Sequence, residues 1–166
     1  MVRLKGCTEI GSEFHWMGLP QGPFLPWPKP LVFFSAGRDA VLSLWNTLQG
    51  IPPKKLFVPH YFCDEVAKWW SMQGICICRY DHGPYYTVPN GNTLQVSAGD
   101  AVLAVNYFGV QDGEWWAKWR DANQDVVLVE DHSHDPMSTW ARNSTADFAF
   151  ASLRKTLPVP DGAILW

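Results

Sequence analysis

Short apolar runs alternate along this chain with segments of helical periodicity from residue 31 onward. Most of the runs are apolar at every position rather than at alternate positions, which is typical of strands buried on both faces of a parallel sheet. Seven strands are therefore predicted, at Leu31–Phe34, Leu56–Val58, Ile75–Tyr80, Ala101–Phe108, Val126–Val129, Ala146–Ala151 and Ala163–Trp166.

Amphipathic helices are predicted in the connections between these runs. The i, i+3, i+4, i+7 spacing of one helix face is followed by Val41, Leu44, Trp45 and Leu48. Tryptophan stripes, which we interpret as core positions, mark two further helices around Val66, Trp69 and Trp70 and around Trp115, Trp116 and Trp119. Alternating strands and helices predict an α/β fold of three layers around a seven-stranded, mainly parallel sheet. The ligand site of such a fold lies at the carboxyl ends of the strands.

The first thirty residues differ from the rest. Five closely spaced prolines exclude a regular helix or a central strand in the last part of this segment. They are Pro20, Pro23, Pro26, Pro28 and Pro30. We expect residues 1–30 to form an irregular arm and residues 31–166 to form one α/β domain, which is a normal size for a single domain.

The amino-acid composition limits the binding partners and the cellular compartment that can be expected for this chain. Thirteen Lys and Arg residues against sixteen Asp and Glu residues give a net charge of −3, so no basic excess favours nucleic acid or an anionic membrane. No run reaches the roughly 18 apolar residues of a membrane-spanning helix, and the N-terminus lacks the apolar segment of a secretory signal. A cytoplasmic location is expected. Cys76 and Cys78 alternate with isoleucines, as small core residues of a strand would.

Polar residues cluster after the fifth predicted strand, in the sequence Glu130-Asp131-His132-Ser133-His134-Asp135. The His-x-His spacing with neighbouring carboxylates is compatible with Zn²⁺ ligation. One hypothesis is therefore a metal-dependent hydrolase built on Asp131, His132, His134 and His60.

Lys155 follows the sixth predicted strand and supports a different chemistry. A lysine desolvated at the mouth of a sheet can attack a carbonyl group and form a Schiff base. Asp131, at the end of the neighbouring strand, could hold a pyridinium N–H group, and the turn Ser35–Asp39 opens a helix whose N-terminus could hold a phosphate. The lysine and the aspartate are the two protein groups that pyridoxal phosphate (PLP) most needs.

Five segments resemble, in order and spacing, the DegT/DnrJ/EryC1/StrS family of PLP-dependent sugar aminotransferases, which have the aspartate-aminotransferase fold (fold type I). The segments are Ser35-Ala36-Gly37-Arg38-Asp39-Ala40, Val58-Pro59-His60-Tyr61, Asn106-Tyr107-Phe108-Gly109, Glu130-Asp131-His132-Ser133-His134 and Ser152-Leu153-Arg154-Lys155 followed by Asp161-Gly162-Ala163. The resemblance covers residues 31–166.

The resemblance implies a role for each matched site residue. Lys155 would form the Schiff base with PLP and shuttle a proton at the α-carbon, Asp131 would pair with the pyridine nitrogen, and His134 would contact the ring hydroxyl. Gly37 and Arg38 fall where a Gly-Thr pair of the family binds the phosphate.

Two positions depart from the family pattern. A serine that often lies five residues before the lysine is Phe150 here, and Ser152 lies three residues before it instead. Cys63 stands where an aromatic side chain commonly stacks on the cofactor ring, so Tyr61 or Phe62 would have to stack.

Family members continue for roughly as many residues again beyond the seventh strand, so the resemblance covers only their N-terminal half and implies an absent C-terminal domain. The family chemistry is amino transfer from an amino acid to a keto-sugar, expected to be nucleotide-linked. A non-catalytic or vestigial binding or assembly module is the alternative. Without those covering segments, either the arm at 1–30 or another subunit must cover the apolar strands, and we expect both, with a symmetric homodimer.

Overall fold

The computed structural model describes residues 31–48 and 53–166, and these form one seven-stranded sheet with the strand order β1-β7-β6-β5-β4-β2-β3. The strands are β1 (Val32–Phe34), β2 (Leu56–Pro59), β3 (Ile77–Tyr80), β4 (Ala101–Val105), β5 (Val127–Asp131), β6 (Phe148–Ser152) and β7 (Ala163–Leu165). β7 pairs antiparallel with both β1 and β6, and all other pairs are parallel. The predicted mainly parallel sheet is confirmed.

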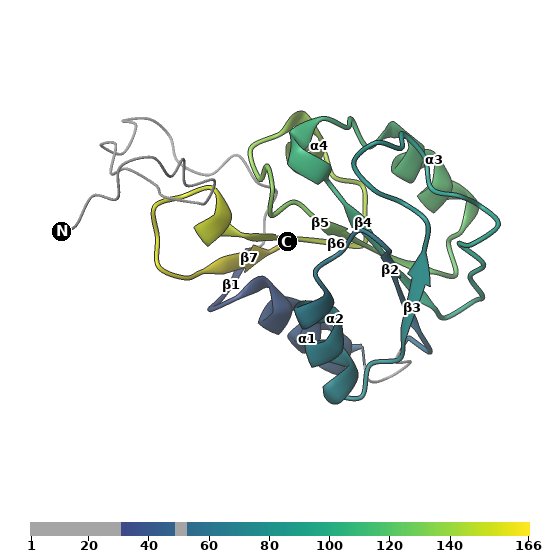
Figure 1. Ribbon diagram of the computed structural model, residues 1–166, viewed down its shortest axis with the longest axis horizontal. Helices are drawn as coiled ribbons and strands as arrows, with labels where there is room; N and C mark the ends of the chain where they lie inside the picture. The colour runs from purple at the N-terminus through teal and green to yellow at the C-terminus, as the bar shows by residue number, and fades with distance from the viewer. Residues whose placement is uncertain (1–30, 49–52) are drawn as a thin grey trace, which may run out of the picture.

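Helices cover both faces of this sheet, which gives three layers (Figure 1). Figure 1 shows α1 (Gly37–Thr47) and α2 (Asp64–Met72) on one face and α3 (Glu114–Ala122) and α4 (Thr139–Arg142) on the other. Two short 3₁₀ turns follow β4 and β6, namely η1 (Tyr107–Gly109) and η2 (Leu153–Lys155). None of the helices in the described residues is long and apolar enough to cross a membrane.

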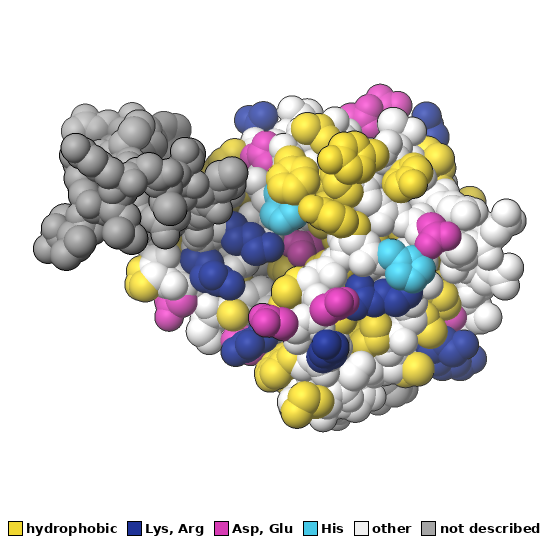
Figure 2. Space-filling view, viewed as in Figure 1, with side chains coloured by type: hydrophobic (Ala, Val, Ile, Leu, Met, Phe, Trp, Pro, Cys, Tyr) yellow, Lys and Arg dark blue, Asp and Glu magenta, His cyan; other side chains and the backbone are white. Residues whose placement is uncertain are grey.

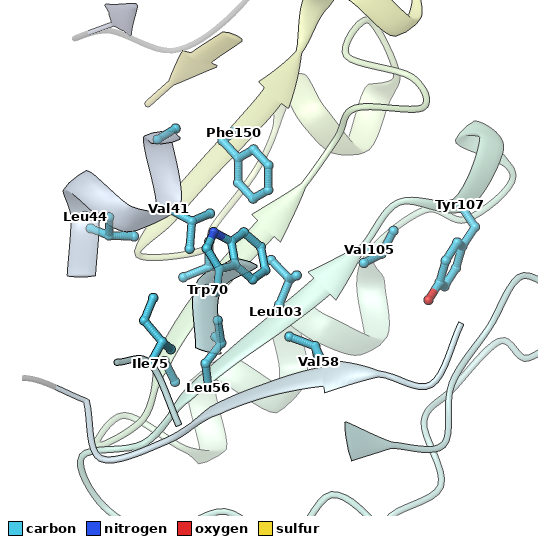
Figure 3. Close-up of a cluster of buried hydrophobic side chains, with 13 residues drawn as sticks. Val41, Leu44, Leu56, Val58, Trp70, Ile75, Leu103, Val105, Tyr107 and Phe150 are labelled. Carbon is cyan, nitrogen blue, oxygen red and sulfur yellow. The ribbon is translucent and has the colours of Figure 1, made fainter. Parts of the chain in front are cut away.

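The continuously apolar runs became strands because helices bury them from both sides. Every residue of β2 and β4 is buried, and the two sides of the sheet carry separate cores. Figure 3 shows the core beneath α1 and α2, where Trp70 and Phe150 lie among aliphatic side chains. Trp116 is buried in the core on the opposite face, so both tryptophans are core residues as predicted.

The structure differs from the sequence-based prediction of elements and burial at three places. Cys76 precedes β3 and is exposed, and Cys78 within β3 is only half-buried, because β3 is the edge strand of the sheet rather than a central one. The run predicted to extend to Phe108 ends as a strand at Val105 and continues into η1. The four-residue helix α4 has no counterpart among the predicted elements. The predicted arm at 1–30 lies outside the described residues.

Candidate functional site

Two adjoining hollows lie at the carboxyl edge of the sheet, each of about 390 Å³. The first is bordered by Tyr61 and His134, and the second by Gly37, Arg38 and Ser152. Asp131 and Lys155 line both hollows, as do Phe62 and Cys63. The structure therefore brings all seven sequence-predicted site residues to one edge. Figure 2 shows basic, acidic and histidine side chains gathered on this face, with hydrophobic side chains beside them.

Asp131 is the buried acid of the site. It is the last residue of β5 and lies in register between Val105 of β4 and Phe150 of β6. Its side chain accepts a hydrogen bond at Oδ1 from the Ser133 backbone N–H at 2.8 Å, and its backbone carbonyl accepts one from the Asn106 N–H at 2.9 Å. Both bonds fix the carboxylate where the two hollows meet.

Lys155 lies at the mouth of the site on η2, immediately after β6. Its side chain is exposed, so the expectation of a desolvated lysine is wrong. The physical reason is that the 3₁₀ turn carries the chain away from the sheet edge before the lysine is reached. Lys155 nevertheless lines both hollows, as Asp131 does.

His134 is coupled electrostatically to both of these residues. Burial lowers the pKa of His134 below its ordinary value of 6.5, the positive charge of Lys155 lowers it further, and the negative charge of Asp131 opposes them. The ring stacks on Phe108 with the two centroids 4.7 Å apart and the planes inclined by 11°. Burial and the Lys155 charge therefore favour the neutral imidazole, which is held against an aromatic face.

The turn after β4 supplies two residues for which the sequence analysis proposed no role. Phe108 has a positive φ of 55°, which a bulky side chain rarely adopts and which marks strain at a site. Tyr107 is buried and its hydroxyl donates to the Tyr61 backbone carbonyl at 2.7 Å. Burial raises the Tyr107 pKa well above its ordinary value. The signal available in the sequence was the position of both residues directly after a buried strand.

The N-terminus of α1 borders the second hollow. The amides of Gly37 and Arg38 belong to the first turn and have no intrahelical acceptor. A Cβ atom on Gly37 would lie 3.0 Å from the Phe150 ring, so this turn packs on β6 more closely than a larger residue permits. The Arg38 guanidinium lies over the Trp69 ring, 5.0 Å from its centroid, with Nε 3.9 Å from Asp39.

Three residues between β2 and α2, Tyr61, Phe62 and Cys63, border the first hollow. The Phe62 ring stacks on Trp70, with the centroids 5.5 Å apart, and the Tyr61 ring meets Tyr107 edge-on. Cys63 occupies the N-cap of α2 and lines both hollows without offering a ring face. An aromatic surface for a planar ligand is therefore available from Tyr61 or Phe62.

The arrangement does not support the metal-dependent hydrolase. His132 points to the opposite face of β5 from Asp131, where its Nε2 lies 2.9 Å from Glu130 Oε2. His60 lies 2.6 Å from Asp81 instead of joining His134. Within residues 31–48 and 53–166, no three His, Cys, Asp or Glu side chains lie close enough together to hold a metal ion. His132 and His134 both lie beyond the end of β5, in the turn that follows it, so the two histidines of the His-x-His motif do not share a centre.

Comparisons with known proteins identify the fold. No family model and no curated protein matches the chain. Among solved structures, a putative sugar aminotransferase from Streptococcus pneumoniae in its PMP form is similar over 84% of this chain, with a TM-score of 0.62 and 16% identity. NtdA from Bacillus subtilis with bound cofactor PMP is similar over 82%, with a TM-score of 0.65 and 14% identity.

A phosphoserine aminotransferase, SerC from Cytophaga hutchinsonii, is similar over 82% of the chain, with a TM-score of 0.55 and 19% identity. The similar region is 41%, 33% and 38% of these three proteins, respectively, so this chain spans about two fifths of their length or less. The chain has the fold of the PLP-dependent aminotransferases.

Proposed function

We propose that this chain binds PLP at the carboxyl edge of its sheet and carries the aminotransferase chemistry of that fold. The observation that carries the proposal is the pair formed by Asp131 and Lys155, which line the same two hollows beside the N-terminus of α1. PLP needs an amine, an acceptor for its ring N–H group and a site for its phosphate. The donors and acceptors of this edge fit all three requirements.

Each residue has a role that follows from its position. Lys155 is the amine that attaches the cofactor and moves a proton to and from the substrate α-carbon. Asp131 holds the proton on the ring nitrogen, because its carboxylate is fixed and buried. Free N–H groups at Gly37 and Arg38, with Ser152 beside them, bind the phosphate, which the helix dipole favours. When bound, the cofactor supplies an electron sink for the carbanion formed at the α-carbon.

Tyr61 and His134 complete the proposed site on the side of the first hollow. Tyr61 offers a ring face to the cofactor, while the neutral His134 ring donates to or accepts from the ring hydroxyl. The amino acceptor in this proposal is a keto-sugar and the donor an amino acid. Support for the acceptor comes from the family resemblance and from the similarity to a putative sugar aminotransferase.

Addition of PLP to the purified protein tests the assignment of the lysine. A visible absorption band that borohydride makes permanent is expected for the parent chain. Lys155→Ala should abolish it, whereas Lys118→Ala should retain it, because Lys118 is an exposed lysine on α3, where it pairs with Glu114. An identical band from Lys155→Ala and from the parent would show that another amine attaches the cofactor.

Turnover is measured separately from binding, since this chain spans only part of the solved structures that it resembles. The assay follows loss of the visible band on addition of an amino acid and its return on addition of a keto-sugar. A band that persists through both additions would identify a binding module without transamination. That result would retain the PLP site and remove the enzymatic proposal.

A further inference from the structure

A second buried acid and a second histidine lie directly behind Asp131. Successive side chains of a strand point to opposite faces, so Glu130 and His132 face α3 and α4 while Asp131 faces the hollows. Glu130 is 1% exposed and His132 is fully buried. Ionisable side chains are almost never buried this completely unless they are paired. No role in the proposed chemistry has been given to either.

The His132 ring is held on every side. Its Nε2 lies 2.9 Å from Glu130 Oε2, and its Nδ1 lies 3.1 Å from the Asn106 side-chain nitrogen. The two ring nitrogens therefore bridge the Asn106 amide and the Glu130 carboxylate, and with the amide nitrogen as donor the ring proton is assigned to Nε2. Trp140 meets the ring edge-on at 5.2 Å, and Trp166 stacks on it at 5.6 Å.

Asn106 connects this buried pair to the backbone of Asp131. Its own N–H donates to the Asp131 carbonyl at 2.9 Å, while its side chain donates to His132 and, at 2.8 Å, to Ser138 at the N-cap of α4. The residue thus joins the end of β4, the end of β5 and the start of α4. Both neighbours of Asp131 in the chain and its carbonyl oxygen belong to one hydrogen-bonded network.

The network continues into the candidate site through the next residues. The Ser133 N–H donates to Asp131 Oδ1 at 2.8 Å, and Ser133 Oγ accepts from the Ser152 N–H at 2.9 Å. The His132 N–H donates to the Phe150 carbonyl at 2.8 Å. A shift of His132 would therefore move the two hydrogen bonds that orient the Asp131 carboxylate and the proposed phosphate ligand Ser152.

We propose that Glu130 and His132 are positioning residues that, through Asn106, fix the direction of the Asp131 carboxylate from the far side of the sheet. The role in catalysis rests on the proposed function, but the positioning itself does not. A strand end without such a network would leave Asp131 on a loop that can twist. Displacement of a catalytic group by about 1 Å can cost on the order of 100-fold in rate.

Two variants test the network. His132→Phe keeps a ring between the two tryptophans but leaves the Glu130 carboxylate buried without its partner, and it can fail to fold for that reason. The double variant Glu130→Met/His132→Phe replaces the hydrogen-bonded pair with apolar groups of similar volume, so neither partner of that bond is left unsatisfied. Leu128→Ala is the matched control, since Leu128 is fully buried on the same face of β5 and in the adjacent core.

Amide hydrogen exchange measured by NMR is the primary readout and needs no cofactor. In the double variant we expect the Ser133 and Ser152 amides to exchange about tenfold or more faster relative to the amides of the β4–β5 ladder. Leu128→Ala should leave this ratio unchanged even if it lowers global stability. Unlike His132→Phe, the variant His132→Gln retains a side-chain donor toward Glu130. Its Ser133 and Ser152 amides should therefore keep much of their protection from exchange.

The cofactor provides the second readout. The double variant should bind PLP at least about tenfold more weakly than Leu128→Ala and show a shifted visible band, because Asp131 no longer holds the ring proton in place. Unchanged protection of Ser133 and Ser152 in the double variant would overturn the positioning role, whatever the cofactor does. Absence of PLP binding in the parent chain would instead overturn the proposed function, with the exchange result still deciding the inference.

Discussion

At the scale of single residues, the site is defined by how His134, Lys155 and Asp131 influence one another. Burial and the positive charge of Lys155 lower the pKa of His134, and the negative charge of Asp131 acts in the opposite direction. The three side chains line one hollow, so each charge is felt without a direct ion pair. Their coupling can be measured without any ligand.

Removal of the Lys155 charge should raise the pKa of His134. In the parent chain, NMR titration of the histidine ring signals should give a His134 pKa below 6.5. Lys155→Ala removes a charge that disfavours the imidazolium, so the pKa should move up toward its ordinary value. Asp131→Asn should move it further down. An unchanged titration in Lys155→Ala would mean that the amine does not reach the histidine.

His82 should make the folded chain less stable in mild acid. Burial lowers the pKa of His82 to about 4 from 6.5, against a smaller effect of the Tyr86 backbone. The unfolded chain therefore gains a proton that the folded chain does not as the pH falls from 6.5 to 4, and stability decreases over that range by about 2–3 kcal/mol. Urea unfolding at several pH values measures this slope.

Two variants identify the source of that slope. His82→Phe should remove most of it, because the ring lies among Tyr80, Tyr107 and Trp116 and a phenyl group suits that environment. Val88→Ala should leave it in place, since Val88 is an exposed residue of the same connection and carries no titrating group. If His82→Phe kept the full dependence, another group would be responsible.

At the scale of secondary-structure elements, the contact between α1 and β6 decides the shape of the second hollow. Gly37→Ala should lower the free energy of unfolding by about 1–3 kcal/mol, because the new methyl group meets the Phe150 ring at 3.0 Å. Denaturant unfolding measures the change. Gly91→Ala is the control, since nothing lies within 4 Å of its added Cβ.

Relief of the clash distinguishes packing from helix propensity. Phe150→Leu combined with Gly37→Ala should be more stable than the sum of the two single effects predicts, because each substitution accommodates the other. Strict additivity would place the cost of Gly37→Ala elsewhere than in this contact.

The sequence predicted elements more accurately than their ends. All seven strands were predicted, because a strand that is buried on both faces is apolar at consecutive positions, as β4 is. The exposure of Cys76 was missed because the position of β3 at the sheet edge depends on strand order, which local patterns do not contain. The short α4 carries too few residues for a detectable periodicity.

The candidate site followed the same rule. Parallel strands end at one edge whatever their order, so residues such as Asp131 and Lys155 could be brought together from the positions of the strand ends alone. The opposite directions of His132 and His134 depend on where β5 ends and the turn begins. The exposure of Lys155 depends on a 3₁₀ turn that no sequence signal marked.

At the scale of the whole molecule, self-association remains a prediction. Apolar side chains at one sheet edge are exposed, with Phe33 of β1 at 66% and Val32 at 50%. A symmetric dimer is the commonest closed assembly and would bury such groups. Light scattering across a dilution series should give twice the mass of the 18.8 kDa chain. A monomer at every concentration would contradict the dimer.

The position of β7 has a consequence for the order in which the protein forms. β7 lies between β1 and β6, although β1 and β7 stand at opposite ends of the described chain. During synthesis, β2 to β6 can pair as they emerge, but β1 has no neighbour until β7 arrives. Such long-range pairing slows folding. The α1 turn at Gly37 follows β1 directly, so we expect the proposed phosphate-binding part of the site to reach its final position only after β7 has paired with β1.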